Sequence, residues 1–311
     1  MKVVFMGTPD FAVETLKALY EAGHEIILAV SQPDKPKGRS GKLAPTPVKE
    51  FALEHDIPVY QPVKIRAEES VEYLKQYQAD VFVVAAFGQI LPKVILDMPR
   101  LGCVNVHGSL LPKYRGAAPI QWAVINGEKV SGNTTMLMGP GLDDGDMLLK
   151  SEIELAADET GGSLFDKLAI DGGKLAVKTI EALDRGEITP IPQDESKATH
   201  VGMISKEMGN IDWTKPADEI ERLIRGLNPW PSAFSFIDGK QVKLWSATVV
   251  DRTGQPGTII DVNKNVFTVA CGSQALEINE LQLEGKKRMA TGDFLRGYSL
   301  ETGKRFVNGR E

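Results

Sequence analysis

Short apolar runs that alternate with amphipathic segments constrain the fold of this chain more than any other feature. Apolar runs occupy residues 3–6, 25–31, 81–87 and 103–106, and residues 10–21 have the apolar spacing of a helix. Strands that alternate with helices predict a mostly parallel sheet with helices on both faces. Ligands of such sheets bind beyond the carboxyl ends of the strands.

Three predicted strand ends carry turn residues or polar side chains. The runs end at a Gly-Thr-Pro turn (residues 7–9), a Phe-Gly-Gln turn (residues 87–89) and His107. Because the carboxyl ends of parallel strands share one edge of a sheet, we expect the functional site there.

The C-terminal third changes character. A long helix is predicted over residues 159–185, and a polar segment with two prolines, residues 188–201, is interpreted as a linker. Two β runs then flank an Asp-Gly turn at residues 238–239, which predicts a hairpin, and another pair surrounds residues 263–265. Several short strands with turn signals predict a small barrel or a sandwich.

The length favours two domains, and the composition is that of an ordinary soluble globular protein. The chain has 311 residues, 42% of them apolar, without an apolar run of about 20 residues. Its first residues have a strand pattern and no secretory cleavage signal. The lack of a long apolar run predicts no membrane contact. Cys103 and Cys271 are far apart and form no C-x-x-C pair, so we expect a reduced, cytoplasmic protein with no zinc site.

The charge distribution contains one basic segment. A net charge of −6 argues against a generally basic nucleic-acid binder, but residues 206–311 carry +1 and the remainder −7. Residues 34–42 hold four cations and one acid beside two glycines. On charge alone, this segment is either a solvated loop or a binding loop.

The stretch from residue 103 to residue 119 holds the first catalytic candidates. Asn105, His107 and Ser109 alternate, so in an extended chain they project to one side. An Asn amide can donate to a developing oxyanion, and a His can donate or carry a proton near neutral pH. A purely structural His at a strand end is the alternative interpretation.

A second polar cluster, GPGLDDGDM, spans residues 139–147. Its spacing does not match the twelve-residue EF-hand loop. One of its carboxylates could orient His107 and stabilise the imidazolium. Ser109 could then be a nucleophile, but the G-x-S-x-G signature of many serine hydrolases is missing.

Two other interpretations have weaker support. The first turn lacks the G-x-G-x-x-G fingerprint of dinucleotide-binding proteins. Four aromatic residues of the C-terminal third could stack on bases, although aromatics in strands more often pack in a core: Trp230, Phe234, Phe236 and Trp245.

Taken together, the motifs resemble the folate-dependent formyltransferases. They are, in chain order, MGTPDFAVETLKAL, SQPDKPKGRSGKLAPTPVK, AAFGQILPK, GCVNVHGSLLPKYRGAAPIQ and GLDDGDM. Three later stretches, DETGGSLFDKLA, ISKEMGNIDW and RGLNPWPSAF, are similar to the branch that acts on methionyl-tRNA. The likeness covers nearly the whole chain.

The resemblance implies an activity and a catalytic set. The enzyme would move a formyl group from 10-formyltetrahydrofolate to the α-amine of methionine on initiator tRNA, for translation initiation. The family's catalytic residues fall on Asn105, His107 and Asp143. Asp144 replaces a more common Thr and adds a charge beside the site. Ser109 then becomes a turn residue or substrate contact.

The resemblance also implies binding residues. The folate would lie against Phe87, Gly88, Gln89, Ile90, Leu91, Ser109, Leu110, Leu111 and Pro112. The tRNA would contact Lys35, Lys37, Arg39 and Lys42 in the basic segment and Lys286, Lys287 and Arg288 in the second domain. No metal is required, and we expect a monomer.

These inferences define one expected architecture. It is an α/β chain with a Rossmann-like, mostly parallel N-terminal sheet and a small, OB-like C-terminal β-barrel. We predict a catalytic domain over residues 1–189, a linker over 190–205 and a tRNA-binding domain over 206–311. The alternatives are a formyltransferase for a small amine, such as a sugar amine or purine precursor, and a tRNA-binding protein without chemistry.

Overall fold

The computed structural model describes residues 1–37 and 41–309, which form two compact units. The first unit comprises Met1–Pro119, Val130–Glu154 and Phe165–Val201. The second comprises Ile120–Lys129, Leu155–Leu164 and Gly202–Glu311. The proposed domain boundaries stay predictions, and each unit is described by itself.

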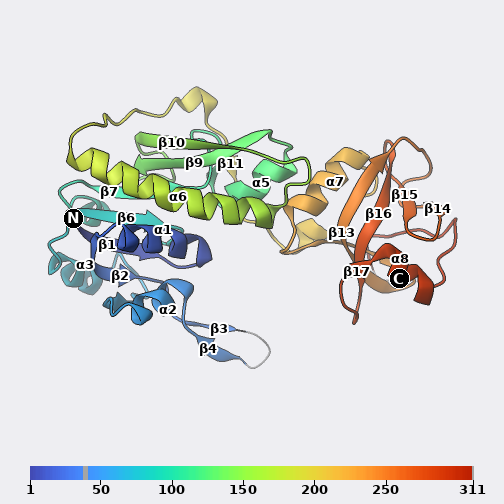
Figure 1. The fold of residues 1–311 in the computed structure, drawn as a ribbon, viewed down its shortest axis with the longest axis horizontal. Helices are drawn as coiled ribbons and strands as arrows, with labels where there is room; N and C mark the ends of the chain where they lie inside the picture. Colours follow the sequence, from blue (N-terminus) through green and yellow to red (C-terminus); the bar gives the residue numbers. More distant parts are fainter. Residues whose placement is uncertain (38–40, 310–311) are drawn as a thin grey trace. The chain divides into compact units, whose positions relative to one another are not determined.

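A seven-stranded sheet forms the centre of the first unit (Figure 1). Its order is β10 (Met147–Glu154), β9 (Val130–Leu137), β7 (Cys103–His107), β6 (Val81–Ala85), β1 (Lys2–Gly7), β2 (Glu25–Val30) and β5 (Val59–Tyr60). The ladders from β7 to β5 are parallel, whereas β9 and β10 pair antiparallel. The predicted mostly parallel sheet is therefore confirmed.

Burial of the central strands explains their continuous apolar sequence. Residues 3–6 of β1 and 81–83 of β6 are fully buried, because helices cover both faces of a parallel sheet. The helices of this unit are α1 (Asp10–Glu21), α2 (Pro47–Glu54), α3 (Glu68–Lys75), α4 (Lys93–Leu96) and most of α6 (Gly161–Asp184). Phe11 of α1 meets Phe165 of α6 edge to face, with ring centroids 5.6 Å apart.

Two short ladders complete the first unit. One is the hairpin of β3 (Lys35–Lys37) and β4 (Lys42–Ala44), and the other joins β8 (Arg115–Gly116) to β11 (His200–Val201) in parallel. The 3-10 turn η1 (Glu195–Lys197) precedes β11.

The polar segment interpreted as a linker is attached to this unit along much of its length. After α6 it passes along β10, where Ile191 bridges Met147, and then enters β11 (Figure 1). Polar residues and prolines are typical of a tether, but they also suit a segment that binds through its backbone groups.

The second unit contains an antiparallel sheet. Its order is β12 (Ala233–Ile237), β13 (Lys240–Val250), β16 (Ala275–Leu283), β15 (Phe267–Ala270) and β14 (Ile259–Val262), with β17 (Met289–Ala290) beside β16. The other elements are α5 (Pro119–Ile125), η2 (Glu207–Gly209), α7 (Ala217–Gly226) and α8 (Thr291–Gly297). The Asp-Gly hairpin is confirmed: Asp238 and Gly239 have φ of 49° and 68°, as a type I′ turn requires.

Closure of this sheet depends on the end of the chain. Single antiparallel bridges join Phe236 to Val307 and Thr258 to Arg305. The continuous ladders leave β12 and β14 as the two ends of the sheet. The separate antiparallel domain is confirmed, and its barrel closure and OB-like type stay predictions.

Among the described residues, no helix combines the length and apolarity that crossing a membrane requires.

Candidate active site

Strand β7 delivers two polar side chains to the carboxyl edge of the sheet. Asn105 and His107 have only 8% and 7% of their surface exposed. Asn105 pairs with Val84 of β6, and His107 with Thr134 of β9, so both lie in the interior of the sheet. Alternation of side chains along the strand places them on one face, as predicted.

The imidazole of His107 lies between a carbonyl and a carboxylate. Its Nε2 is 2.8 Å from the carbonyl oxygen of Tyr114, and its Nδ1 is 3.7 Å from Oδ2 of Asp143. A carbonyl can only accept, so Nε2 carries a proton. In the neutral ring, Nδ1 therefore carries no proton and can accept one. When Nδ1 is protonated, its N–H points toward the carboxylate of Asp143.

Asp143 is fixed by the backbone of the motif that follows β7. The amide of Gly116 donates to Asp143 Oδ2 at 2.8 Å. Gly116 has φ of 101°, and a Cβ there would lie 2.5 Å from the carbonyl oxygen of Val201. Only glycine permits this approach, which explains why the sequence reads Arg-Gly at this point.

The carboxamide of Asn105 is free to bind a substrate. No hydrogen bond joins it to another residue of the described chain, although the side chain is nine-tenths buried. A buried amide without a protein partner is costly unless a ligand or water supplies one. The arrangement therefore suits a donor aimed at a bound carbonyl oxygen.

The turn after His107 is closed by hydrogen bonds. Ser109 Oγ donates to the Lys113 carbonyl at 2.7 Å, and Thr134 Oγ1 joins the Ser109 carbonyl to the Leu111 amide at 2.7 and 3.0 Å. The Leu111–Pro112 bond is cis. Lys150 Nζ donates to the Leu111 carbonyl at 2.5 Å, and burial lowers the pKa of Lys150. Ser109 is thus engaged as a turn residue.

The turn after β6 is the second part of the predicted folate site. Thr8 Oγ1 and Gln32 Nε2 both donate to the Phe87 carbonyl at 3.2 Å. The side chain of Gln89 bonds to the Ile65 amide at 2.7 Å and to the Pro62 carbonyl at 3.2 Å. Its amide is therefore used to hold the turn.

The remaining predicted folate residues differ in exposure. Phe87 and Leu91 are buried in the apolar cluster beside the sheet, and Leu111 is fully buried. Ile90 is 75% exposed, and Leu110 is half-buried. Since β6 and β7 are neighbours, the structure brings the two predicted turns to the same edge.

The predicted tRNA residues fall in two surface regions. Lys35 and Lys42 are exposed on the β3–β4 hairpin, on which Lys37 also lies, and Arg39 lies outside the described residues. In the second unit, Lys286 and Lys287 are exposed.

Arg288 has intramolecular partners. Its Nε is 3.1 Å from Oε2 of Glu280, and its guanidinium lies 4.8 Å from the centroid of the Trp245 ring. The four C-terminal aromatics are half-buried or exposed rather than core residues, so base stacking stays a prediction.

Two residues of the first unit that sequence reasoning did not count among the catalytic or binding residues contact the site. Arg115 is only 3% exposed and forms an ion pair with Glu195, and Gln193 bonds to the backbone of the Asp143 loop. The ion pair raises the pKa of Arg115 and lowers that of Glu195. No sequence signal linked residues 193 and 195 to Asp143, since the contact exists only in three dimensions.

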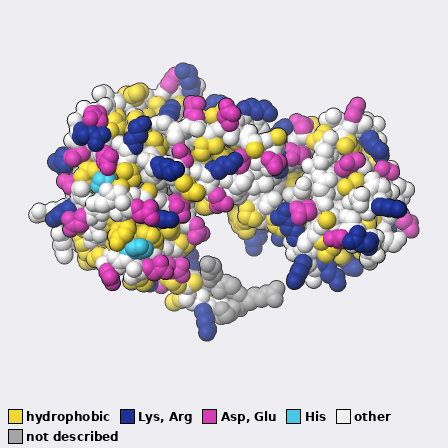
Figure 2. Space-filling view, viewed as in Figure 1, with side chains coloured by type: hydrophobic (Ala, Val, Ile, Leu, Met, Phe, Trp, Pro, Cys, Tyr) yellow, Lys and Arg dark blue, Asp and Glu magenta, His cyan; other side chains and the backbone are white. Residues whose placement is uncertain are grey.

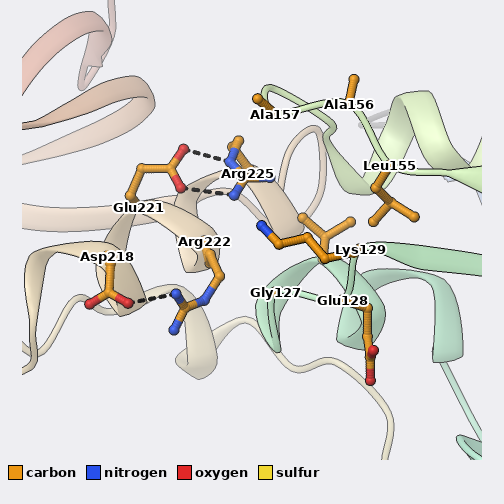
Figure 3. A pocket seen from close by; sticks show the side chains of 11 residues that line it. Gly127, Glu128, Lys129, Leu155, Ala156, Ala157, Asp218, Glu221, Arg222 and Arg225 are labelled. Carbon is orange, nitrogen blue, oxygen red and sulfur yellow. Dashed lines mark hydrogen bonds and ion pairs between the residues drawn. The ribbon is translucent and has the colours of Figure 1, made fainter.

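A small cavity of about 180 Å³ lies in the second unit between α7 and the residues that follow α5 (Figure 3). Two of its cationic groups already have partners: Arg222 pairs with Asp218 at 2.6 Å and Arg225 with Glu221 at 2.5 Å. It contains none of the predicted site residues, and we assign it no function.

Over the described residues, no group of three or more His, Cys, Asp or Glu side chains is arranged to hold a metal ion. The expectation of a metal-free reaction stays a prediction.

Comparison with known proteins identifies the class. A family model described as formyl transferase matches residues 1–180, and one described as its C-terminal domain matches residues 203–299. The chain belongs to the formyl transferase family.

Full-length relatives share a more specific name. A methionyl-tRNA formyltransferase of Agathobacter rectalis is 60% identical over 309 residues, which cover 99% of this chain and 100% of the relative. A methionyl-tRNA formyltransferase of Lachnospira eligens is 58% identical and covers 97% of this chain and 98% of its own.

Solved structures agree on the fold. The sugar 3N-formyl transferase WlaRD, determined with dTDP and 5-N-formyl-THF, has a TM-score of 0.66 at 18% identity, covering 92% of this chain and 99% of its own. HypX from Aquifex aeolicus in complex with tetrahydrofolic acid has a TM-score of 0.64 at 17% identity, covering 98% of this chain and 50% of its own.

Proposed function

We propose that this protein transfers the formyl group of 10-formyltetrahydrofolate to the α-amine of methionine carried by initiator tRNA. The observation that carries the proposal is the unpartnered Asn105 carboxamide beside the Asp143-facing Nδ1 of His107. The full-length relatives named methionyl-tRNA formyltransferase support the choice of substrate.

The attacking group needs little activation. An α-amine has a pKa of about 8, so part of it is neutral at pH 7. The folate supplies an activated formyl carbon when bound. The protein's task is then to orient the amine, stabilise negative charge on the formyl oxygen and manage one proton.

The three site residues divide this task. Asn105 donates its free N–H to the developing oxyanion. His107 accepts a proton at Nδ1, because Nε2 is engaged with Tyr114. Asp143 stabilises the resulting imidazolium, which can donate the proton toward the folate nitrogen that leaves.

The strand ends beside these residues suit the folate. Asn105 offers a buried polar group to the donor, while the backbone of residues 87–90 forms an anchored turn at the same edge. Backbone groups of this turn would read the pterin edge, since the Gln89 amide is already bonded. The Ser109–Pro112 turn would form the adjoining wall.

The cations of the two units would bind the tRNA. Lys35, Lys37 and Lys42, together with Arg39, would contact phosphates of the acceptor arm, and Lys286 and Lys287 would add contacts in the second unit. Arg288 would first have to exchange its contact with Glu280 for a phosphate.

Formylation assays test the proposal. The purified protein is incubated with 10-formyltetrahydrofolate and either methionyl initiator tRNA or a sugar amine or glycinamide ribonucleotide. We expect formylmethionyl-tRNA as the preferred product. His107→Ala and Asn105→Ala should each lower kcat by about 10²–10³. His55→Ala removes a histidine that bonds to Phe51, outside the site, and should retain activity.

Two results would reject it. Preference for a free small amine would support a small-substrate formyltransferase. Turnover within a few-fold of wild type for His107→Ala would rule out the mechanism and favour a protein that only binds tRNA.

A further inference from the structure

We propose that Gln193 is a positioning residue that holds Asp143 in place for catalysis. The inference rests on the proposed role of Asp143 in formyl transfer. Gln193 lies in the segment that follows α6, fifty residues from the loop it contacts.

The side-chain amide of Gln193 joins three groups of the site. Its Nε2 donates to the carbonyl oxygens of Asp143 and Gly145, both at 2.8 Å. Its Oε1 accepts from Nε of Arg115 at 3.0 Å. Both amide protons are used, so the side chain acts as a clamp across the loop before β10.

Arg115 fixes the other end of this clamp. Its buried guanidinium forms a bidentate pair with Glu195, with N–O distances of 3.0 and 2.7 Å. Its backbone amide donates to the Thr199 carbonyl at 2.8 Å. The following residue is Gly116, whose amide donates to Asp143 Oδ2. The segment of Gln193 and Glu195 therefore supports Asp143 in two ways. It bonds to the backbone of Asp143, and through Arg115 it holds Gly116, whose amide donates to the carboxylate.

Asp143 depends on its neighbours for its position. Its φ is 52°, in the left-handed region that Asp adopts more readily than most residues, so the backbone geometry alone does not fix the side chain. The residue belongs to an irregular loop rich in glycine. Its carboxylate is 3.7 Å from His107, too far for a direct hydrogen bond to fix the pair.

A substitution of similar length separates the clamp from packing. Gln193→Met keeps the chain length and removes both donors and the acceptor. We expect kcat for methionyl-tRNA to fall about tenfold, with KM for folate and for tRNA within twofold and the unfolding midpoint within a few degrees. Asn210→Leu is the matched control, since it removes one amide bond to the Asn308 carbonyl in the second unit.

Coupling to Asp143 distinguishes a positioning role from a structural one. In an Asp143→Asn background, Gln193→Met should lower kcat by less than twofold further. The kcat–pH profile of Gln193→Met should also shift toward that of Asp143→Asn. Gln193→Glu places a carboxylate opposite two carbonyl oxygens and should lose at least as much activity.

Three results would overturn the inference. If kcat is unchanged in Gln193→Met but falls in Asp143→Asn, the clamp is rejected and the proposed function is retained. If Gln193→Met lowers kcat tenfold both in the wild type and in Asp143→Asn, its effect is structural and independent of Asp143. Full activity of Asp143→Asn would instead reject the catalytic role of Asp143, and the clamp with it.

Discussion

The buried charge of Arg115 is balanced by specific partners. Arg115 keeps its charge in the interior because Glu195 and Gln193 satisfy its guanidinium. The carboxylate of Glu195 remains in contact with water, with 71% of the side chain exposed. Such a pair avoids burying two charges and so limits the cost of desolvation.

The Arg115–Glu195 pair predicts a pH-dependent stability. The hydrogen bond with Arg115 lowers the pKa of Glu195 in the folded protein. The pair therefore stabilises the fold above the pKa of the unfolded chain, about 4.3, and this stabilisation is lost as the pH falls through the pKa of the folded state. Glu195→Gln should therefore lower the unfolding midpoint at pH 7, and the difference from wild type should narrow as the pH falls below 5. Thermal unfolding from pH 7 to pH 3 measures this, and a constant difference would contradict it.

At the scale of elements, the loop between β9 and β10 shows how close packing shapes the site. Gly145 is buried, and a Cβ there would lie 1.8 Å from the carbonyl oxygen of Leu137, the last residue of β9. Backbone oxygen cannot give way as a flexible side chain can. The glycine therefore lets the Asp143 loop lie against the end of its own strand.

Gly145→Ala should accordingly destabilise the protein. We expect the free energy of unfolding to fall by about 1–3 kcal/mol, together with a loss of kcat because the Asp143 loop must move. Denaturant unfolding measures the stability. Gly202→Ala is the control, since no atom lies within 4 Å of a Cβ there. Equal stability of the two variants would mean that the loop relaxes without cost.

How much the sequence predicted depended on whether a feature was local. The buried strands, the helix over residues 10–21 and the hairpin at Asp238 followed from periodicity and turn chemistry. Alternation also placed Asn105 and His107 on one face. The contacts of Gln193 with Asp143 could not be predicted, because they depend on a distant segment folding back along β10. Polar residues and prolines do not distinguish such a segment from a tether.

At the scale of the whole molecule, the charge must be considered region by region. The net charge is −6, and Figure 2 shows Lys and Arg interspersed with Asp and Glu over the visible face of the N-terminal unit. The protein as a whole therefore attracts a polyanion such as tRNA only weakly at long range. Under the proposed function, tRNA binding would rely on local cations such as Lys35 and Lys42, which are exposed on one hairpin.

Local phosphate contacts predict a salt dependence that single substitutions change. KM for methionyl-tRNA should rise with salt because bound phosphates release counterions, while KM for the folate should change little. Lys35→Gln and Lys42→Gln should each raise KM for tRNA and reduce the slope of log KM against log salt by about one. Lys178→Gln, an exposed lysine on α6, should leave the slope unchanged. Initial rates between 50 and 200 mM salt measure these slopes. If the slopes of all three variants equal that of the wild type, the phosphate contacts lie at other residues. Removing a lysine that neutralises a phosphate must change the number of counterions released on binding, and with it the slope.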